Sequence, residues 1–258
     1  MSEGPLFILV LLGMGAVAGF INVVAGGGSL LLLPLLVFLG LPEGTANGTI
    51  RMGIIVQNVF AIFRYRAAEV LDYDVAKKLI LPGILGAALG AAIVSYLPDA
   101  SLRTILGWVM LGCAILVVAK PKSKAKTGDD VEDSAKGLPT LGRLRVWPLL
   151  FLLGVYGGMI QAGVGYLMLA SFTLVLGLDL LKANVMKIVV VTSYTPIALG
   201  VFLWQGKVDL LVGLVLSIGQ ALGGWLGASA ALKKGEGFIR VLLVVVVALS
   251  ATKLLELW

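Results

Sequence analysis

The chain has 258 residues, of which 59% are apolar and 13% are charged, and its mean hydropathy is +1.05. Soluble domains carry about 45–50% apolar and about 25% charged residues, so this composition excludes an ordinary soluble protein. The apolar runs lack the alternation of polar and apolar residues that is typical of β-barrel strands. The composition therefore predicts an all-α polytopic membrane protein.

Residue counts exclude several classes of site. The sequence contains no histidine and a single cysteine, Cys113, so no disulfide can form within the chain and the usual ligand sets for zinc or haem are missing. We therefore expect no metal and no cofactor. We also expect no enzyme, because the deep segments hold no paired carboxylates. The net charge of +6 is typical of membrane proteins with basic cytoplasmic loops, and we expect no nucleic-acid partner.

Ten apolar segments fall into two halves around a polar stretch. This stretch, 120–145, holds seven basic and four acidic residues. We expect a first transmembrane repeat over 1–119, a charged cytoplasmic linker over 120–145 and a second transmembrane repeat over 146–258. The predicted segments are 6–24, 30–39, 50–63, 75–97, 102–119, 146–161, 166–176, 183–204, 208–232 and 238–255.

Matching residues recur about 137 positions apart, and the series of matches in one register predicts an internal repeat. Internal repeats are common in secondary transporters, where the substrate site lies at the repeat interface near the middle of the membrane. The matches are Gly40 with Gly177, Asn47 with Asn184, Asp72 with Asp209, the run 86–91 with 223–228 and, at an offset of 139, Asn22 with Gln161.

Each half holds five segments, and the second of them is only about 10–12 residues, whereas a crossing needs about 20. We expect the first two segments to form half-helices or a re-entrant hairpin. The odd segment count predicts inverted halves. Loop charges agree, because the basic loops 63–78 and 232–240 have poorly charged counterparts at 204–208 and 97–103. We expect a multi-pass protein of the cytoplasmic membrane with a cytoplasmic linker and both termini outside.

Glycine-rich turns join the first two segments of each half. Glycine lets the backbone leave a helix inside the membrane, and Ser29 is expected to cap the helix that follows. Helix starts attract anions, so two facing starts would form an anion-binding cradle. The alternative is that the glycines only allow close helix packing. The candidate residues are Asn22, Gly26, Gly27, Gly28, Ser29, Gln161, Gly163, Gly165 and Tyr166.

Two cations, Arg51 and Lys187, lie within apolar segments of the two halves. They are one residue out of strict register, since Arg51 corresponds to Ile188 and Lys187 to Ile50. Placing a cation at the centre of a bilayer costs at least about 3 kcal/mol, and such residues are functional by default. We hypothesise that both contribute to an electropositive pocket for a small anion. The alternative is that their side chains extend to the lipid headgroups.

Further polar residues follow on the same segments. Gln57 and Asn58 lie two turns beyond Arg51, and Gln57 corresponds to Tyr194 in the second half. These three side chains either line the path of a substrate or link helices. Asp72 and Asp209 precede the fourth segment of each half, where we expect them to cap helices.

Three stretches resemble the sulfite exporter TauE/SafE family, also called the 4-toluene sulfonate uptake permease (TSUP) family. They are the glycine-rich run 19–29, the Ala-Asn-Gly-Thr-Ile-Arg stretch 46–51 and the Ala-Asn-Val-Met-Lys stretch 183–187. The resemblance spans both repeats and implies an inner-membrane transporter of small sulfur-containing or carboxylate anions. It also implies that the three glycines at 26–28, Arg51 and Lys187 belong to the anion site.

The first functional hypothesis is a secondary transporter that exports small sulfur-containing oxyanions, such as sulfite or organosulfonates, by alternating access between inverted repeats. Its partners would be the anionic substrate and the lipid bilayer, together with protons if transport is coupled; uniport is the alternative. An anion channel and a transporter of short carboxylates are the other candidates. The sequence does not predict an oligomeric state.

Overall fold

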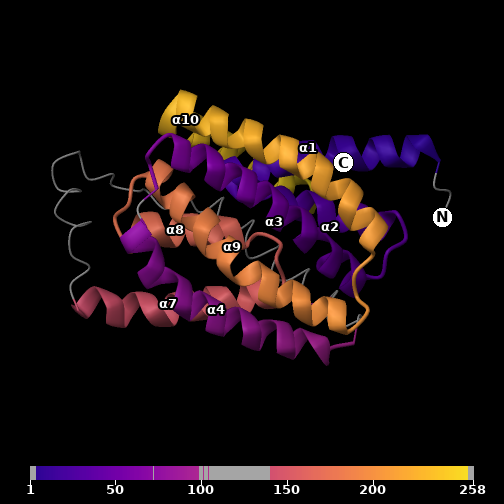
Figure 1. The fold of residues 1–258 in the computed structure, drawn as a ribbon, viewed down its shortest axis with the longest axis horizontal. Helices are drawn as coiled ribbons and strands as arrows, with labels where there is room; N and C mark the ends of the chain where they lie inside the picture. The colour runs from indigo at the N-terminus through magenta and orange to yellow at the C-terminus, as the bar shows by residue number, and fades with distance from the viewer. Residues whose placement is uncertain (1–3, 72, 99–100, 102–103, 105–139, 255–258) are drawn as a thin grey trace.

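The computed structural model describes residues 4–71, 73–98, 101, 104 and 140–254. In this part of the chain the regular secondary structure is entirely helical, which confirms the predicted all-α membrane fold (Figure 1). The predicted fifth segment, Cys113, Asp72 and most of the linker lie outside the described residues. The helices are α1 (Pro5–Ala25), α2 (Gly28–Phe38), α3 (Glu43–Ala67), α4 (Tyr73–Ser95), α7 (Thr140–Met159), α8 (Val164–Leu174), α9 (Leu180–Trp204) and α10 (Leu210–Leu254).

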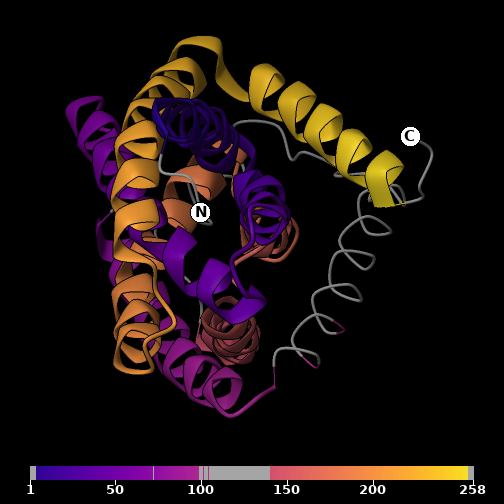
Figure 2. The same cartoon turned by 90° about the vertical axis from the view of Figure 1, so that its right-hand side faces the viewer.

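Three helices in the described residues are both long enough and apolar enough to cross a membrane: α1, α9 and the Leu210–Leu242 part of α10. The α10 helix bends at Gly235, whose φ of 66° and ψ of −162° are not helical. Figure 2 shows its C-terminal part, in yellow, leaving at an angle to the helices before it. The bend separates the two segments that the sequence predicts at 208–232 and 238–255.

The helices α2 and α8 have 11 residues each. At 1.5 Å per residue each is about 17 Å long, roughly half the hydrocarbon thickness of a bilayer. The predicted short second segments are therefore confirmed. Two helices begin well before the predicted segments, by six or seven residues: α3 at Glu43, and α7 at Thr140 inside the predicted linker. Both first turns are polar, so a pattern of apolar residues does not find them.

Equivalent helices of the two predicted repeats make equivalent contacts. The first helix of each repeat packs against the fourth helix of the other, α1 along α10 and α7 along α4 (Figure 1). Small residues permit the close approach: a Cβ added at Gly223 would lie 2.0 Å from the carbonyl oxygen of Ala16, and one at Gly86 would lie 2.1 Å from that of Phe151. The exchange fits the internal repeat, and the opposite orientation of the repeats stays a prediction.

Several polar residues of α3 and α9 are buried inside the molecule. Arg51 is 0% exposed and Lys187 is 2% exposed, and no carboxylate is buried among the residues whose exposure is described. Buried cations must find acceptors, because each unpaired one in an apolar interior is costly. Their partners therefore define the candidate site.

Candidate functional site

Two broken helices meet at the centre of the molecule, at the α1–α2 junction and the α7–α8 junction. Gly26 in the first and Gly163 in the second have φ values of 87° and 77°, in the left-handed region that favours glycine. The junctions touch backbone to backbone, since a Cβ added at Gly165 would lie 2.6 Å from the Cα of Gly26. The predicted meeting of the two glycine turns is thus present.

Arg51 binds the carbonyl end of α7. Its Nη2 donates to the carbonyl of Gly158 (2.8 Å), and its Nη1 donates to the carbonyl of Gly157 (3.0 Å) and to Oε1 of Gln161 (3.1 Å). The last carbonyls of a helix have no N–H partner within it and carry the negative end of the helix dipole. The guanidinium, which also lies over the Phe202 ring, therefore stabilises the point at which α7 breaks.

Lys187 does the same for α1, in the other half of the chain. Its Nζ donates to the carbonyls of Asn22 (3.1 Å) and Val23 (3.3 Å), in the last turn of α1, and to Oδ1 of Asn184 (2.6 Å). An ammonium group has three donors, so all three are in use. Each of these two buried cations thus comes from one half of the chain and binds a helix end of the other half.

The equivalent asparagines Asn47 and Asn184 have different partners. Nδ2 of Asn47 donates to the carbonyl of Met159 at 2.8 Å and so joins Arg51 at the end of α7. Oδ1 of Asn184 accepts from Lys187, while its Nδ2 donates to the hydroxyl of Tyr65 at 3.1 Å. A chain of hydrogen bonds therefore links α3, α9 and α1.

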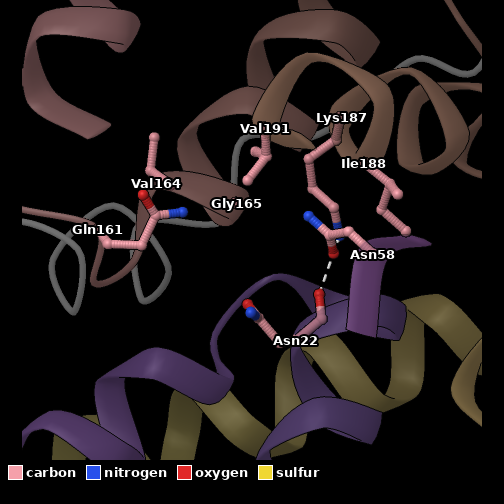
Figure 3. Close-up of a pocket in the computed structure, with 8 residues that line it drawn as sticks. All are labelled: Asn22, Asn58, Gln161, Val164, Gly165, Lys187, Ile188 and Val191. Atoms are coloured by element: carbon pink, nitrogen blue, oxygen red, sulfur yellow. Dashed lines mark hydrogen bonds between the residues drawn. The ribbon is translucent and has the colours of Figure 1, made fainter. Parts of the chain in front are cut away.

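A small cavity, partly open to the outside, lies at this centre, with a volume of about 10 Å³, which is about the space that one water molecule needs (Figure 3). An ammonium group, three side-chain amides and three branched apolar side chains line it, together with Gly165 in the first turn of α8. Among the described residues, no carboxylate lines it. Amide and ammonium donors beside a helix start favour an anion. The lining residues are Asn22, Asn58, Gln161, Val164, Gly165, Lys187, Ile188 and Val191.

Five of the predicted site residues line the cavity and nine do not. Arg51 lies behind Gln161, and Gln57 donates to Oδ1 of Asn58 at 3.4 Å. Two tyrosines pack against glycines: a Cβ added at Gly27 would meet the hydroxyl of Tyr166, and one at Gly157 would meet that of Tyr194. The predicted residues on the cavity are Asn22, Asn58, Gln161, Gly165 and Lys187; those off it are Gly26, Gly27, Gly28, Ser29, Arg51, Gln57, Gly163, Tyr166 and Tyr194.

The expectation that Ser29 caps α2 is wrong. The helix begins at Gly28, two residues before the predicted segment, and its N-cap is Gly27 without a side-chain bond. Because a capping residue precedes the first helical residue, Ser29 lies too far along the chain. Its hydroxyl instead donates across the junction to the carbonyl of Gln161 at 3.4 Å. The expected cap by Asp209 is confirmed, since its Oδ1 accepts from the backbone N–H of Val212 at 3.0 Å.

The sequence analysis did not name Asn184, Tyr65 or the apolar lining residues as members of the site. Asn184 could have been identified from the sequence, because an asparagine recurs about one turn before each buried cation, at positions 47 and 184. No sequence pattern identifies Tyr65, because a tyrosine near basic residues at the end of an apolar segment is typical of a membrane interface. In the structure Tyr65 is 0% exposed.

The chain is similar to one known family and to several known proteins. A family model described as sulfite exporter TauE/SafE matches residues 11–254. A "Probable membrane transporter protein ORF9" of Sinorhizobium sp is 29% identical over 239 residues, covering 93% of this chain and 88% of that protein. A "Probable membrane transporter protein" of Haemophilus influenzae is 28% identical over 257 residues, covering 98% and 96%. "Probable membrane transporter protein YfcA" of Escherichia coli K12 is 29% identical over 254 residues, covering 97% and 90%. No solved structure matches the chain.

Proposed function

Because the chain belongs to the sulfite exporter TauE/SafE family of membrane transporters, we propose that it is a secondary transporter that exports small sulfur-containing oxyanions across the cytoplasmic membrane. Sulfite and small organosulfonates are the proposed substrates. The observation that carries the proposal is the buried side chain of Lys187 at a cavity that no carboxylate of the described residues lines. A buried positive charge without a carboxylate beside it attracts an anion strongly, because little water screens it.

The donors around the cavity suit an oxyanion. A sulfite or sulfonate group presents three oxygen acceptors. Facing it would be the ammonium of Lys187, the side-chain amides of Asn22, Asn58 and Gln161, and the start of α8 at Gly165. Charge-assisted bonds of this kind are about twice as strong as neutral ones. In a wider state of the cavity, the lining side chains of Val164, Ile188 and Val191 would contact the carbon part of an organosulfonate.

Occupation of the cavity would change the contacts of Lys187. Its three donors already bind protein oxygens, so an entering anion must replace one of them. The carbonyls of Asn22 and Val23, at 3.1 and 3.3 Å, are held at longer distances than Oδ1 of Asn184, at 2.6 Å. We propose that the bound anion replaces these carbonyls as a partner of Lys187, which breaks its hydrogen bonds to the end of α1. The loss of these bonds would allow the two predicted repeats to move relative to each other. Alternating access would follow from rocking of the two repeats.

Coupling to protons belongs to the same proposal. No carboxylate is buried among the residues of described exposure. A coupled proton would therefore be carried by Lys187 or by the substrate itself, and transport without a coupling ion is the alternative.

Calorimetry on the purified protein in detergent tests the site. The ligands are sulfite, sulfate, thiosulfate, sulfoacetate, taurine, acetate and chloride, and the variants are Lys187→Met and the matched control Lys182→Met. Lys182 lies on the same helix but is 52% exposed. We expect a sulfur oxyanion to bind wild type and control alike. Lys187→Met should bind it about 10–100-fold more weakly, as the loss of one charge-assisted hydrogen bond predicts.

Two results would contradict the proposal. Binding of acetate without binding of any sulfur anion would make the protein a carboxylate transporter. Equal binding by Lys187→Met and wild type would show that the anion binds at a site without Lys187. Flux through proteoliposomes then distinguishes a transporter from a channel, because only a transporter shows saturation together with counterflow of labelled substrate.

A further inference from the structure

Lys187 has one partner that belongs neither to the helix end it holds nor to the cavity. Oδ1 of Asn184 accepts from its Nζ at 2.6 Å, the shortest of its three hydrogen bonds. Nδ2 of Asn184 donates to the hydroxyl of Tyr65 on α3. Asn184 and Tyr65 are both 0% exposed, and neither lines the cavity.

The direction of this chain of hydrogen bonds is set by the chemistry of Lys187. An ammonium group can only donate, so the amide of Asn184 must turn its oxygen toward Lys187 and its NH₂ toward Tyr65. The hydroxyl of Tyr65 can accept that donor, which the ring of a phenylalanine in its place could not. Asn184 and Tyr65 therefore hold the ammonium group at the edge of the cavity without lining the cavity themselves.

The first repeat lacks this arrangement. Asn47, the equivalent of Asn184, donates to the carbonyl of Met159, and its Oδ1 has no hydrogen-bond partner. Arg51 lies one turn further on α3 and does not line the cavity. The asparagine side chain therefore accepts a hydrogen bond from the neighbouring cation only on α9, where the cation lines the cavity.

We propose that Asn184 is the positioning and specificity-determining residue of the site: as a neutral amide it holds Lys187 toward the cavity and leaves its positive charge uncompensated, with Tyr65 aligning the amide. The inference rests on the proposed function, since it explains why the cavity would select anions. It assigns to Asn184 a role that acts through Lys187 and needs no contact with the substrate.

The charge of the side chain at position 184 is the decisive property. A carboxylate in the place of the amide would lie within hydrogen-bond distance of the Nζ of Lys187. The pair would carry no net charge whether the proton stayed on Lys187 or moved to the new acid. Leucine has nearly the same shape as asparagine and aspartate, so Asn184→Leu removes the hydrogen bonds without altering the charge of Lys187.

The test measures the Kd of sulfite and of sulfoacetate by calorimetry. The variants are Asn184→Asp, Asn184→Leu and Tyr65→Phe, and Gln205→Glu is the control. The control makes the same amide-to-carboxylate change just beyond the other end of α9, about 32 Å from position 184 along the helix. Thermal unfolding and gel filtration in detergent report whether each variant is folded.

We expect Asn184→Asp to lose at least as much affinity as Lys187→Met, about 10–100-fold. Asn184→Leu should lose less, about 3–10-fold, because the charge remains but its position is no longer fixed. Tyr65→Phe should raise the Kd by a similar factor of about 3–10, because the amide of Asn184 loses the acceptor that aligns it. A role in packing alone would give equal losses for the aspartate and leucine variants.

The failure of this inference can be distinguished from that of the proposed function. If the wild type binds neither anion, the proposed function fails and the inference falls with it. If the wild type and Gln205→Glu bind but Asn184→Asp binds equally well, the inference alone is wrong. Should Asn184→Asp not fold, wild-type affinity in both Asn184→Leu and Tyr65→Phe would overturn it.

Discussion

Replacement of Arg51 by methionine should weaken the fold more than it weakens anion binding. The guanidinium donates three hydrogen bonds at the end of α7, to the carbonyls of Gly157 and Gly158 and to Oε1 of Gln161. Methionine fills much of the same space but donates none. In a membrane interior such bonds contribute about 0.6–1.7 kcal/mol each, so we expect the free energy of unfolding to fall by about 2–5 kcal/mol.

The free energy of unfolding can be measured by titration with a denaturing detergent in mixed micelles, followed by circular dichroism. Lys182→Met is again the control, because its exposed pair with Asp179 contributes less than about 1 kcal/mol. Anion affinity is measured on the same samples. The reasoning would be refuted if Arg51→Met unfolded like the wild type and yet lost anion binding, since Arg51 would then contact the substrate directly.

Two further predictions concern the junctions and caps. Gly165→Ala should destabilise the protein and weaken anion binding, because the new Cβ would lie 2.6 Å from the Cα of Gly26. Gly200→Ala is the control, because a Cβ there would have no neighbour within 4 Å, and it should change neither property. Thermal unfolding measures the stability of both variants, and calorimetry measures their anion binding. Asp209→Ala removes the side-chain cap of α10 and should cost about 0.5–2 kcal/mol of stability while the Kd stays unchanged; wild-type stability in this variant would show that the cap is dispensable.

Hydropathy was enough to predict the helical fold and the approximate positions of its apolar helices. Nine of the ten predicted segments fall on helices of the described residues, and the tenth lies outside them. Hydropathy fails at helix starts, because the first turns of α3 and α7 are polar and still helical. In α3, Gly44, Ala46 and Asn47 at this start are buried by packing against other parts of the chain, which the local sequence does not show.

The candidate site was predicted in its components but not in its geometry. The buried cations and the glycine turns follow from the cost of charge and of broken helices in a membrane. Their partners do not, because Arg51 and Lys187 bind backbone carbonyls more than 100 residues away. Any residue offers a carbonyl, so no pattern of side chains marks those acceptors. For this reason the sequence placed both cations in one pocket, whereas only Lys187 lines it.

The exchange of helices between the repeats also affects how the chain is made. The backbones of Gly19 and Gln220 touch, although 201 residues separate them. Synthesis proceeds from the N-terminus at about 5–20 residues per second, so α1 spends about 10–40 s in the bilayer before the α10 residues that cover its glycine face emerge. Contacts so distant in sequence also form slowly. The central site therefore assembles only when translation is almost complete.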